Sequence, residues 1–533
     1  MAAGRQPFLN MKTLLYNGKI WLGRNYFATV IGLDSESGKI IFAGKNSKDN
    51  RNIYSDAIDL KGRLVLPAFT DGHCHLFKGA QVNSEIDLRY AKTPGEFRDR
   101  ILSYKQTLKS GGWITGGYFS EVNFTENFKV DKYLLDSICS DIPMVIFRTD
   151  LHSVICNSSA LEKLNIESKS GEFSEEEVIR DERGLTGQLQ ERAKHYAVTT
   201  MPQMSEDEKK SVLLKQVEKL HSYGITSVTD ISWREDLHVY LSAYKESTLN
   251  LKINSVIPLD EYTKLEDYKI EFSEYKDYIR FGGVKSFYDG SLSSHSALFH
   301  SKYKGKNHSG MRMDEVKSGD FRKLSLEADK LGYQMVVHAI GDLAVKEVLD
   351  FAEEMEELKG IRDRRFRIEH AQHISESDIR RFKKYNIIVS VQPAHIFFDA
   401  KTAAENIVNP ESTHIFSKLR DEGIRLCFGT DFPVVPENPF DSIYYAITRK
   451  AAGYPDGFNT EYALDLITCL EAYTINNAYA SYEENTKGSL AEGKTADITV
   501  IDTDLFNADT EEIKNANVDL TFLNGKIVYE RHG

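Results

Sequence analysis

Two histidines, His73 and His75, stand two residues apart at the end of an apolar stretch of the sequence. On a β-strand, residues i and i+2 point to the same side, so both imidazoles would face one point, as a metal site requires. A His-x-His pair alone is modest evidence, because many such pairs are merely surface histidines. Its place directly after Asp71-Gly72, at the end of an apolar stretch, favours a metal site.

Four further residues suited to metal binding or proton transfer close later apolar stretches: Lys285, His338, His370 and Asp431. Each alone has an ordinary explanation. A buried histidine is usually a hydrogen-bonded core residue, Lys285 could be a salt-bridge partner, and Asp431 could cap the next helix. Taken together, in this order and at these positions, they predict one site.

The elements that must position these residues alternate between short apolar strands and amphipathic helices. Eight strands are expected at 64–69, 225–229, 251–256, 281–287, 334–338, 366–370, 388–392 and 425–430. Ser205-x-x-Glu208 is a capping box that predicts a helix start before the second strand. This alternation predicts an α/β protein with a (β/α)₈ TIM-like barrel, whose strands converge at their carboxyl ends on the face that carries the active site.

The remaining chain predicts two additions to the barrel, which we place at 64–485. Both ends of the chain carry a strand followed by Asn-Gly-Lys, so 1–63 and 486–533 are expected to form one small composite β-sandwich. The segment 77–204, after the first strand, is too long for a βα loop and is expected to be an inserted subdomain over the barrel mouth. Residues 1–10 are expected to be a flexible extension, or a remnant of cloning, before the first strand.

Composition excludes several classes of function. The net charge of -13 disfavours binding to nucleic acid or to an anionic membrane. The sequence has no apolar run of about 18 residues and no secretory signal at its start. Its five cysteines are scattered without a CxxC pair, which favours a reducing, cytoplasmic location.

The pattern of His-x-His on strand one, lysine on strand four, histidines on strands five and six and aspartate on strand eight resembles the amidohydrolase superfamily. The resemblance covers nearly the whole chain. It is closest to the amidohydrolase-3 branch, which contains the N-substituted formamide deformylases and the YtcJ-like proteins. The matching stretches are 66–75, 284–292, 338–342, 367–372, 429–434 and 488–497.

The resemblance implies a set of roles for these residues. Lys285 would be carboxylated and bridge two metal ions, with His73, His75 and Asp431 on one ion and His338 and His370 on the other. One or two ions remain open, and zinc fits a mixed histidine and oxygen donor set, with manganese, iron or cobalt as alternatives. Asp431 would take a proton from the attacking water and pass it to the leaving nitrogen.

Residues that would face a small-molecule substrate are less sharply defined. His295 lies in an expected loop over the barrel mouth and is as well explained as a structural hydrogen-bond donor. His152 and Asn157 match a further stretch of the branch and lie in the insert. Trp113 could line an apolar pocket, although core packing explains it better, and Gln392 closes strand seven.

Three functions compete. The leading hypothesis is metal-dependent hydrolysis of a carbon–nitrogen bond in a small amide, such as an N-substituted formamide or another N-acyl compound. The second is hydrolysis of an ester, carbamate or cyclic amide by the same site. The third is a catalytically silent barrel with a binding role, which the complete ligand set disfavours. Dimers are common among the relatives, so a homodimer is left open, although no residue of the sequence itself indicates one.

Overall fold

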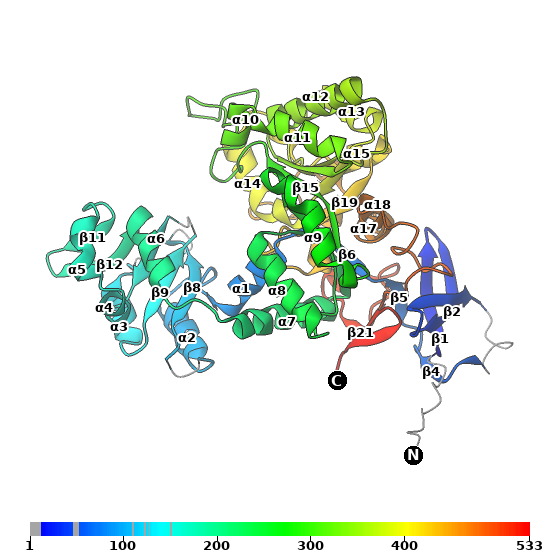
Figure 1. The fold of residues 1–533 in the computed structure, drawn as a ribbon, viewed down its shortest axis with the longest axis horizontal. Helices are drawn as coiled ribbons and strands as arrows, with labels where there is room; N and C mark the ends of the chain where they lie inside the picture. Colours follow the sequence, from blue (N-terminus) through cyan, green and yellow to red (C-terminus); the bar gives the residue numbers. More distant parts are fainter. Residues whose placement is uncertain are drawn as a thin grey trace, which may run out of the picture. The chain divides into compact units, whose positions relative to one another are not determined.

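The computed structural model describes residues 12–45, 53–108, 111–121, 124–126, 128–149 and 152–532. The chain divides into two compact units, one made of Met1–Leu76 and Leu214–Gly533 and the other of Phe77–Leu213 (Figure 1). The expected extension at 1–10 lies outside the described residues. Among the residues that are described, no helix has the length and apolar character needed to cross a membrane.

The first unit contains the predicted barrel. Its eight parallel strands are hydrogen-bonded in chain order, from first to last. They are β6 (Phe69–Cys74), β13 (Ile225–Ile231), β14 (Lys252–Pro258), β15 (Ile279–Phe287), β16 (Gln334–Ala339), β17 (Arg367–His370), β18 (Ile388–Val391) and β19 (Leu426–Phe428). The strands are short and almost fully buried, as expected for a parallel sheet covered on both faces.

The segment after β19 closes the barrel against β6. The backbone N–H of Asp431 donates to the carbonyl of His73 at 2.7 Å, and the N–H of His75 donates to the carbonyl of Phe432 at 2.8 Å. Gly429 permits this approach, because a Cβ there would lie 2.4 Å from the backbone nitrogen of His73. The first and last strands of the barrel are thus joined at His73, His75 and Asp431, which the sequence predicts to be metal ligands.

Helices between the strands cover the outside of the barrel. They include α8 (Arg234–Lys245), α11 (Asp320–Lys330), α12 (Asp342–Lys359), α13 (Ile379–Lys384), α15 (Phe416–Asp421) and α16 (Pro439–Thr448). In α12 the buried side chains recur three or four residues apart, at Val345, Val348, Leu349 and Ala352. This spacing puts them on one helical face, which packs inward.

The stretch predicted as the first barrel strand, 64–69, is divided between two sheets, which corrects that prediction. Residues Leu64–Pro67 form β5, which pairs with β1 (Lys12–Gly23) and β20 (Ile498–Ile501). The barrel strand begins only at Phe69. Both parts are fully buried, so the apolar run continues through the junction and periodicity alone does not reveal where the chain changes partners.

Both ends of the chain meet in one eight-stranded sheet, and Figure 1 shows the N-terminal strands in blue and the C-terminal ones in red. Its order is β22-β21-β20-β5-β1-β2-β3, with β4 paired to β1. The remaining strands are β2 (Tyr26–Asp34), β3 (Lys39–Gly44), β4 (Asp56–Asp59), β21 (Val518–Leu523) and β22 (Lys526–Glu530). Leu15, Ile31, Val500 and Phe522 share one core, which ties the two ends together.

The second unit has its own mixed sheet, in the order β11-β12-β10-β9-β8-β7. Its strands are β7 (Ile86–Asp87), β8 (Ile114–Phe119), β9 (Met144–Arg148), β10 (Ser153–Cys156), β11 (Val178–Asp181) and β12 (Gly184–Gln190). The helices α2 (Pro94–Lys105), α3 (Lys132–Ile138), α4 (Ser158–Lys163) and α6 (Glu191–Thr200) belong to the same unit. Two apolar clusters, around Phe97 and around Leu161, form its interior.

Candidate metal centre

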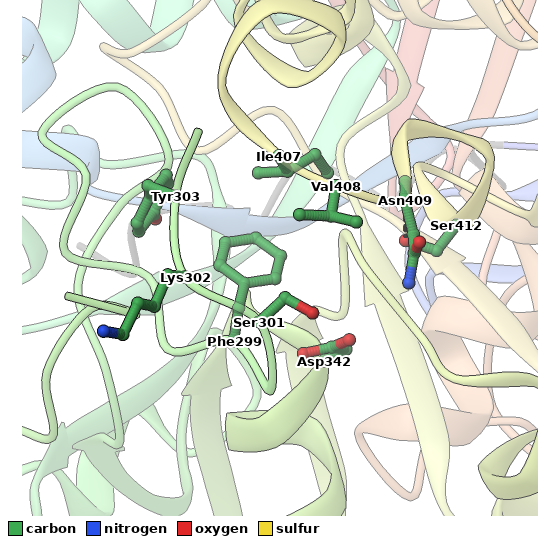
Figure 2. Close-up of a pocket in the computed structure, with 9 residues that line it drawn as sticks. All are labelled: Phe299, Ser301, Lys302, Tyr303, Asp342, Ile407, Val408, Asn409 and Ser412. Atoms are coloured by element: carbon green, nitrogen blue, oxygen red, sulfur yellow. Dashed lines mark hydrogen bonds between the residues drawn. The ribbon is translucent and has the colours of Figure 1, made fainter. Parts of the chain in front are cut away.

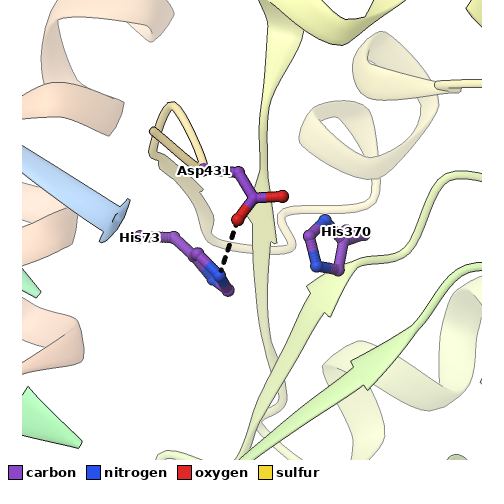
Figure 3. A group of neighbouring side chains, drawn as sticks. All are labelled: His73, His370 and Asp431. Atoms are coloured by element: carbon purple, nitrogen blue, oxygen red, sulfur yellow. Dashed lines mark ion pairs between the residues drawn. The ribbon is translucent and has the colours of Figure 1, made fainter. Parts of the chain in front are cut away.

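The carboxyl ends of β6 and β17 and the turn after β19 bring His73, His370 and Asp431 together. One possible ligand atom from each of the three lies within 4.8 Å of the others. Figure 3 shows the carboxylate of Asp431 beside the imidazole of His73, with the His370 ring on its other side. His370 and Asp431 have left-handed backbones, with φ of 70° and 58°. Such a backbone is costly for a non-glycine residue and is found most often at functional sites.

His73 is held between two carboxylates. Its Nδ1–H donates to Glu369, and its Nε2 lies 3.3 Å from Oδ1 of Asp431. Glu369 is itself fixed by Arg367, whose Nε lies 2.9 Å from Oε1. A carboxylate that accepts from one ring nitrogen orients a histidine so that its other nitrogen can bind a metal ion.

His370 and His338 are oriented in the same way by neutral acceptors. His370 Nδ1 lies 2.9 Å from Oε1 of Gln392, and His338 Nε2 lies 3.2 Å from the carbonyl of Gly290. The two ring centroids are 4.5 Å apart. Each histidine therefore has a second nitrogen left for a ligand. Gln392, predicted to contact substrate, holds a candidate ligand with its Oε1, and its Nε2 donates to the carbonyl of Ser390 at 3.5 Å.

His75 completes the histidine set on the other side of Asp431. Its Nε2 lies 3.3 Å from Oδ1 of Asp431, the same oxygen that His73 approaches. Its ring lies beside that of Trp233, with centroids 5.5 Å apart. His75 is less buried than His73, because it stands nearer the open end of the barrel.

Lys285 lies two residues before the carboxyl end of β15 and is almost completely buried, with 3% of its surface exposed. Among the described residues, its Nζ has no hydrogen-bond partner. Burial lowers the pKa of Lys285 to about 8, although Glu369 and Asp431 act in the opposite direction. An amine in this state is partly neutral at physiological pH and is thus a potential nucleophile or ligand.

The site keeps two histidines neutral and its central carboxylate charged. Burial lowers the pKa of His338 to about 3 and that of His370 well below its ordinary value. Burial raises the pKa of Asp431, but hydrogen bonds from His73 and His75 outweigh it and hold the pKa far below normal. Neutral imidazoles and an ionised carboxylate are the forms in which these groups bind metal ions.

His73 behaves differently from the other two buried histidines. Burial and Lys285 lower its pKa, but the carboxylates of Glu369 and Asp431 outweigh both, so the pKa is raised. A proton on Nε2 would therefore compete with a metal ion for the same lone pair. Nitrogen and oxygen donors clustered at this spacing, with the orphaned amine of Lys285 beside them, fit a divalent transition metal such as zinc.

Three supporting residues were not assigned roles from the sequence: Glu369, Arg367 and Asp71. Asp71 accepts from the backbone N–H groups of His73 at 3.1 Å and Thr430 at 3.0 Å, and so ties β6 to the segment carrying Asp431. Burial raises its pKa to about 6. The only signal for Glu369 and Arg367 was their i, i+2 spacing on a strand, which gives them a common side.

The structure does not bring His295 into contact with these residues. Its Nε2 lies 3.0 Å from Oδ1 of Asn406, and its ring packs against Tyr303. Figure 2 shows a small pocket near this segment, lined in part by Phe299, Tyr303 and Asp342. No candidate metal ligand is among the residues that line this pocket.

The other three predicted substrate contacts belong to the second unit. His152 is exposed, with Nδ1 3.1 Å from Oε1 of Glu191. Asn157 is buried and caps α4: its amide accepts from two backbone N–H groups and donates to two carbonyls. That uses the whole hydrogen-bonding capacity of the amide. Trp113 packs against the apolar cluster around Leu161.

Comparison with known proteins places the chain in a family. A family model described as "Amidohydrolase family" matches residues 56–529. The "Protein LONG AFTER FAR-RED 3" of Arabidopsis thaliana is 30% identical, over 97% of this chain and 91% of its own. The "N-substituted formamide deformylase" of Arthrobacter pascens is 26% identical, over 93% and 94%.

A solved structure extends the likeness to the whole fold. The uncharacterised metal-dependent hydrolase from Pyrococcus horikoshii superposes with a TM-score of 0.76 at 25% identity, covering 94% of this chain and 99% of the other. The family match and the shared architecture agree with the strand-end residues found above. The chain belongs to the amidohydrolase family.

Proposed function

We propose that the protein is a metal-dependent hydrolase that cleaves a carbon–nitrogen bond in a small amide. The convergence of His73, His370 and Asp431 within 4.8 Å carries the proposal. Each histidine of this cluster has Nδ1 held by an acceptor outside the cluster, and the Nε2 of His73 faces Asp431 within it. That arrangement serves a metal ion, and a core histidine kept only for stability would have no need of it.

His73, His75 and Asp431 would hold one ion, and His338 and His370 would hold a second if two are bound. Zinc is the ion that this donor set suits best. The contacts of Asp431 with both His73 and His75, and the close packing of His338 on His370, support this division.

Lys285 would join the set as a carbamate. Its neutral amine attacks carbon dioxide, a nitrogen–carbon bond forms, and one proton leaves, so that a buried cation becomes an anionic oxygen ligand. The lowered pKa of about 8 supports this step, because only the unprotonated amine reacts. The lack of a hydrogen-bond partner for Nζ among the described residues also supports it, since a buried ammonium without hydrogen bonds is costly.

Asp431 would act as the general base and then as the general acid. A divalent ion held by these residues would supply Lewis acidity and would lower the pKa of water to about 7. The water adds to the amide carbonyl while its proton passes to the Asp431 carboxylate. The carbon–nitrogen bond then breaks, and Asp431 returns the proton to the leaving nitrogen, giving a carboxylic acid and an amine. Glu369 keeps the His73 ring oriented throughout.

N-substituted formamides are the first substrates to test, because a relative that matches over nearly its whole length bears the name of a formamide deformylase. The decisive measurement combines metal content by elemental analysis with turnover of a panel of N-alkyl and N-aryl formamides. The protein is purified without chelator, alongside Lys285→Ala and, as a control, Lys346→Ala. Lys346 is an exposed lysine on α12, paired with Asp350.

About two equivalents of metal, falling in Lys285→Ala and unchanged in Lys346→Ala, would support the bridged site. About one equivalent, unchanged in both variants, would remove the bridge and leave a single ion on His73, His75 and Asp431. No metal after reconstitution with zinc would contradict the hydrolase proposal.

A further inference from the structure

An exposed tryptophan lies directly against the candidate metal centre. Trp233 has 43% of its surface exposed, and its ring lies 5.5 Å from that of His75, tilted by 30°. Exposed tryptophan is unusual because its ring carries a large apolar area. The other two tryptophans differ, since Trp21 is buried and Trp113 packs into an apolar cluster. The exposure of Trp233 is therefore a feature to explain.

The backbone around Trp233 is fixed on both sides. Before it, the N–H of Ser232 donates to the carbonyl of Val256 on the neighbouring strand at 3.0 Å. At Trp233 itself, the backbone N–H donates to Oδ2 of Asp236 at 2.7 Å, and the carbonyl accepts from Leu237 as α8 begins. A rigid, exposed aromatic ring is a preorganised surface for a ligand.

Trp233 is linked to Asp431 through His75. His75, which packs on Trp233, approaches Oδ1 of Asp431 at 3.3 Å. On the same segment as Asp431, the N–H of Val434 donates to the carbonyl of Asp431 at 2.9 Å, and 61% of Val434 is exposed. The exposed Trp233 thus contacts a histidine that approaches the carboxylate which would protonate the leaving nitrogen, and the exposed Val434 follows that carboxylate by three residues.

We propose that Trp233 determines specificity by binding an aromatic or other large apolar group on the amide nitrogen. This rests on the proposed hydrolysis and narrows its substrate class. Because Asp431 delivers a proton to the nitrogen, the substituent on that nitrogen lies on the side of Trp233 and Val434. A flat ring stacks there with an offset, which covers the exposed face of the indole. A small polar substituent leaves that face in water.

The test compares two substrates that share an acyl group, N-benzylformamide and N-methylformamide. The proteins are the wild type, Trp233→Ala, Trp233→Phe and the control Phe398→Ala. Phe398 is also an exposed aromatic residue after a barrel strand, but its described ring contact is with Phe397. We expect Trp233→Ala to lower kcat/KM for the benzyl compound about 10- to 50-fold, mainly through KM. For the methyl compound the change should be less than about twofold.

Trp233→Phe should recover most of the loss, and Phe398→Ala should behave as the wild type with both substrates. An equal loss for both substrates in Trp233→Ala, accompanied by loss of metal, would overturn the proposal and make Trp233 a support for His75. Metal content of each variant is therefore measured on the same samples.

A binding measurement separates this proposal from the proposed function. Benzylamine and methylamine, the amines that the two substrates would release, are titrated calorimetrically into the zinc-loaded protein. Tighter binding of benzylamine, by about tenfold or more and lost in Trp233→Ala, would support the role of Trp233 even if neither amide is hydrolysed. Equal binding of both amines would overturn it, whether or not the protein is active.

Discussion

The two ends of the barrel treat buried charge in opposite ways. At the amino-terminal ends of the strands, Lys252 pairs with Asp497 at 2.6 Å, and Arg365 forms a two-pronged contact with Glu484. At the carboxyl ends, Lys285 is more deeply buried than either cation but has no hydrogen-bond partner among the described residues. A buried charge that is paired serves the fold, whereas one that is left unpaired costs stability and indicates a function.

The histidines of the candidate metal centre also distinguish the carboxyl-terminal end of the barrel from the amino-terminal end. His73 and His370 each use one ring nitrogen for a strong acceptor and leave the other facing a shared point. Among the described residues, no group of three possible ligand atoms gathers in this way at the amino-terminal end. The lesson is that several oriented polar groups facing one point, rather than a single unsatisfied one, mark the working end of the barrel.

Replacing Lys285 and Lys252 by methionine should give the largest effects and should separate a functional lysine from a structural one. Lys285→Met should reduce amide hydrolysis by about 10³-fold or more, because a metal ligand is lost. The metal-free protein should not become less stable, since an unpaired buried amine is removed. Lys252→Met should destabilise the fold by about 3 kcal/mol, because Asp497 is left without its cation, with activity retained in the folded fraction. Activity and thermal midpoints of both variants measure this.

A loss of stability in Lys285→Met as large as that in Lys252→Met would contradict the distinction between the two ends. It would mean that Lys285 has a stabilising partner in the folded protein and is an ordinary structural lysine.

The pH dependence of stability should report the unpaired lysine directly. The pKa of Lys285 is lowered by burial from 10.5 to about 8 in the folded protein. Below pH 8 both states carry the proton and the folding penalty is complete. Between pH 8 and 10.5 the folded protein loses the proton that the unfolded chain keeps. The free energy of unfolding should therefore rise through this window by up to about 3 kcal/mol.

Denaturant unfolding of metal-free protein in carbon dioxide-free buffer would measure this rise. The difference between wild type and Lys285→Met isolates the contribution of the lysine. A difference that stays constant from pH 8 to 10.5 would show that the pKa of Lys285 is not lowered.

The structure confirms the predicted barrel, and the six chemistry-bearing residues stay a prediction; both were drawn from local patterns. Apolar stretches alternate with helices, and polar residues stand where strands end. Sequence reasoning misplaced the first barrel strand, because β5 and β6 are one apolar run that two different sheets share. No periodic signal marks the residue at which a buried chain changes partners.

The supporting contacts were harder to predict, for two physical reasons. Strand alternation predicts that Glu369 and His370 point to opposite faces of the strand. In the structure His370 has a left-handed backbone, with φ of 70°, and its ring lies near that of His73. Asn157 was predicted to bind substrate because its stretch resembles the family, yet its amide caps α4. Both facts depend on backbone conformation, which the residue type does not determine.

Glu369→Gln should give the smallest effect on the metal centre. The pKa of this carboxyl is far below normal: burial raises it, but Arg367 and His73 outweigh the burial, so Glu369 is ionised at neutral pH. Glutamine keeps an acceptor for His73 Nδ1–H but removes the charge, which should weaken metal affinity about 10- to 100-fold. The matched change Glu484→Gln removes the carboxylate that pairs with Arg365 at the amino-terminal end of the barrel, and it should leave metal affinity unaltered. Competition with a chelator of known affinity measures both, and equal effects would place His73 in a structural network, as an ordinary buried histidine.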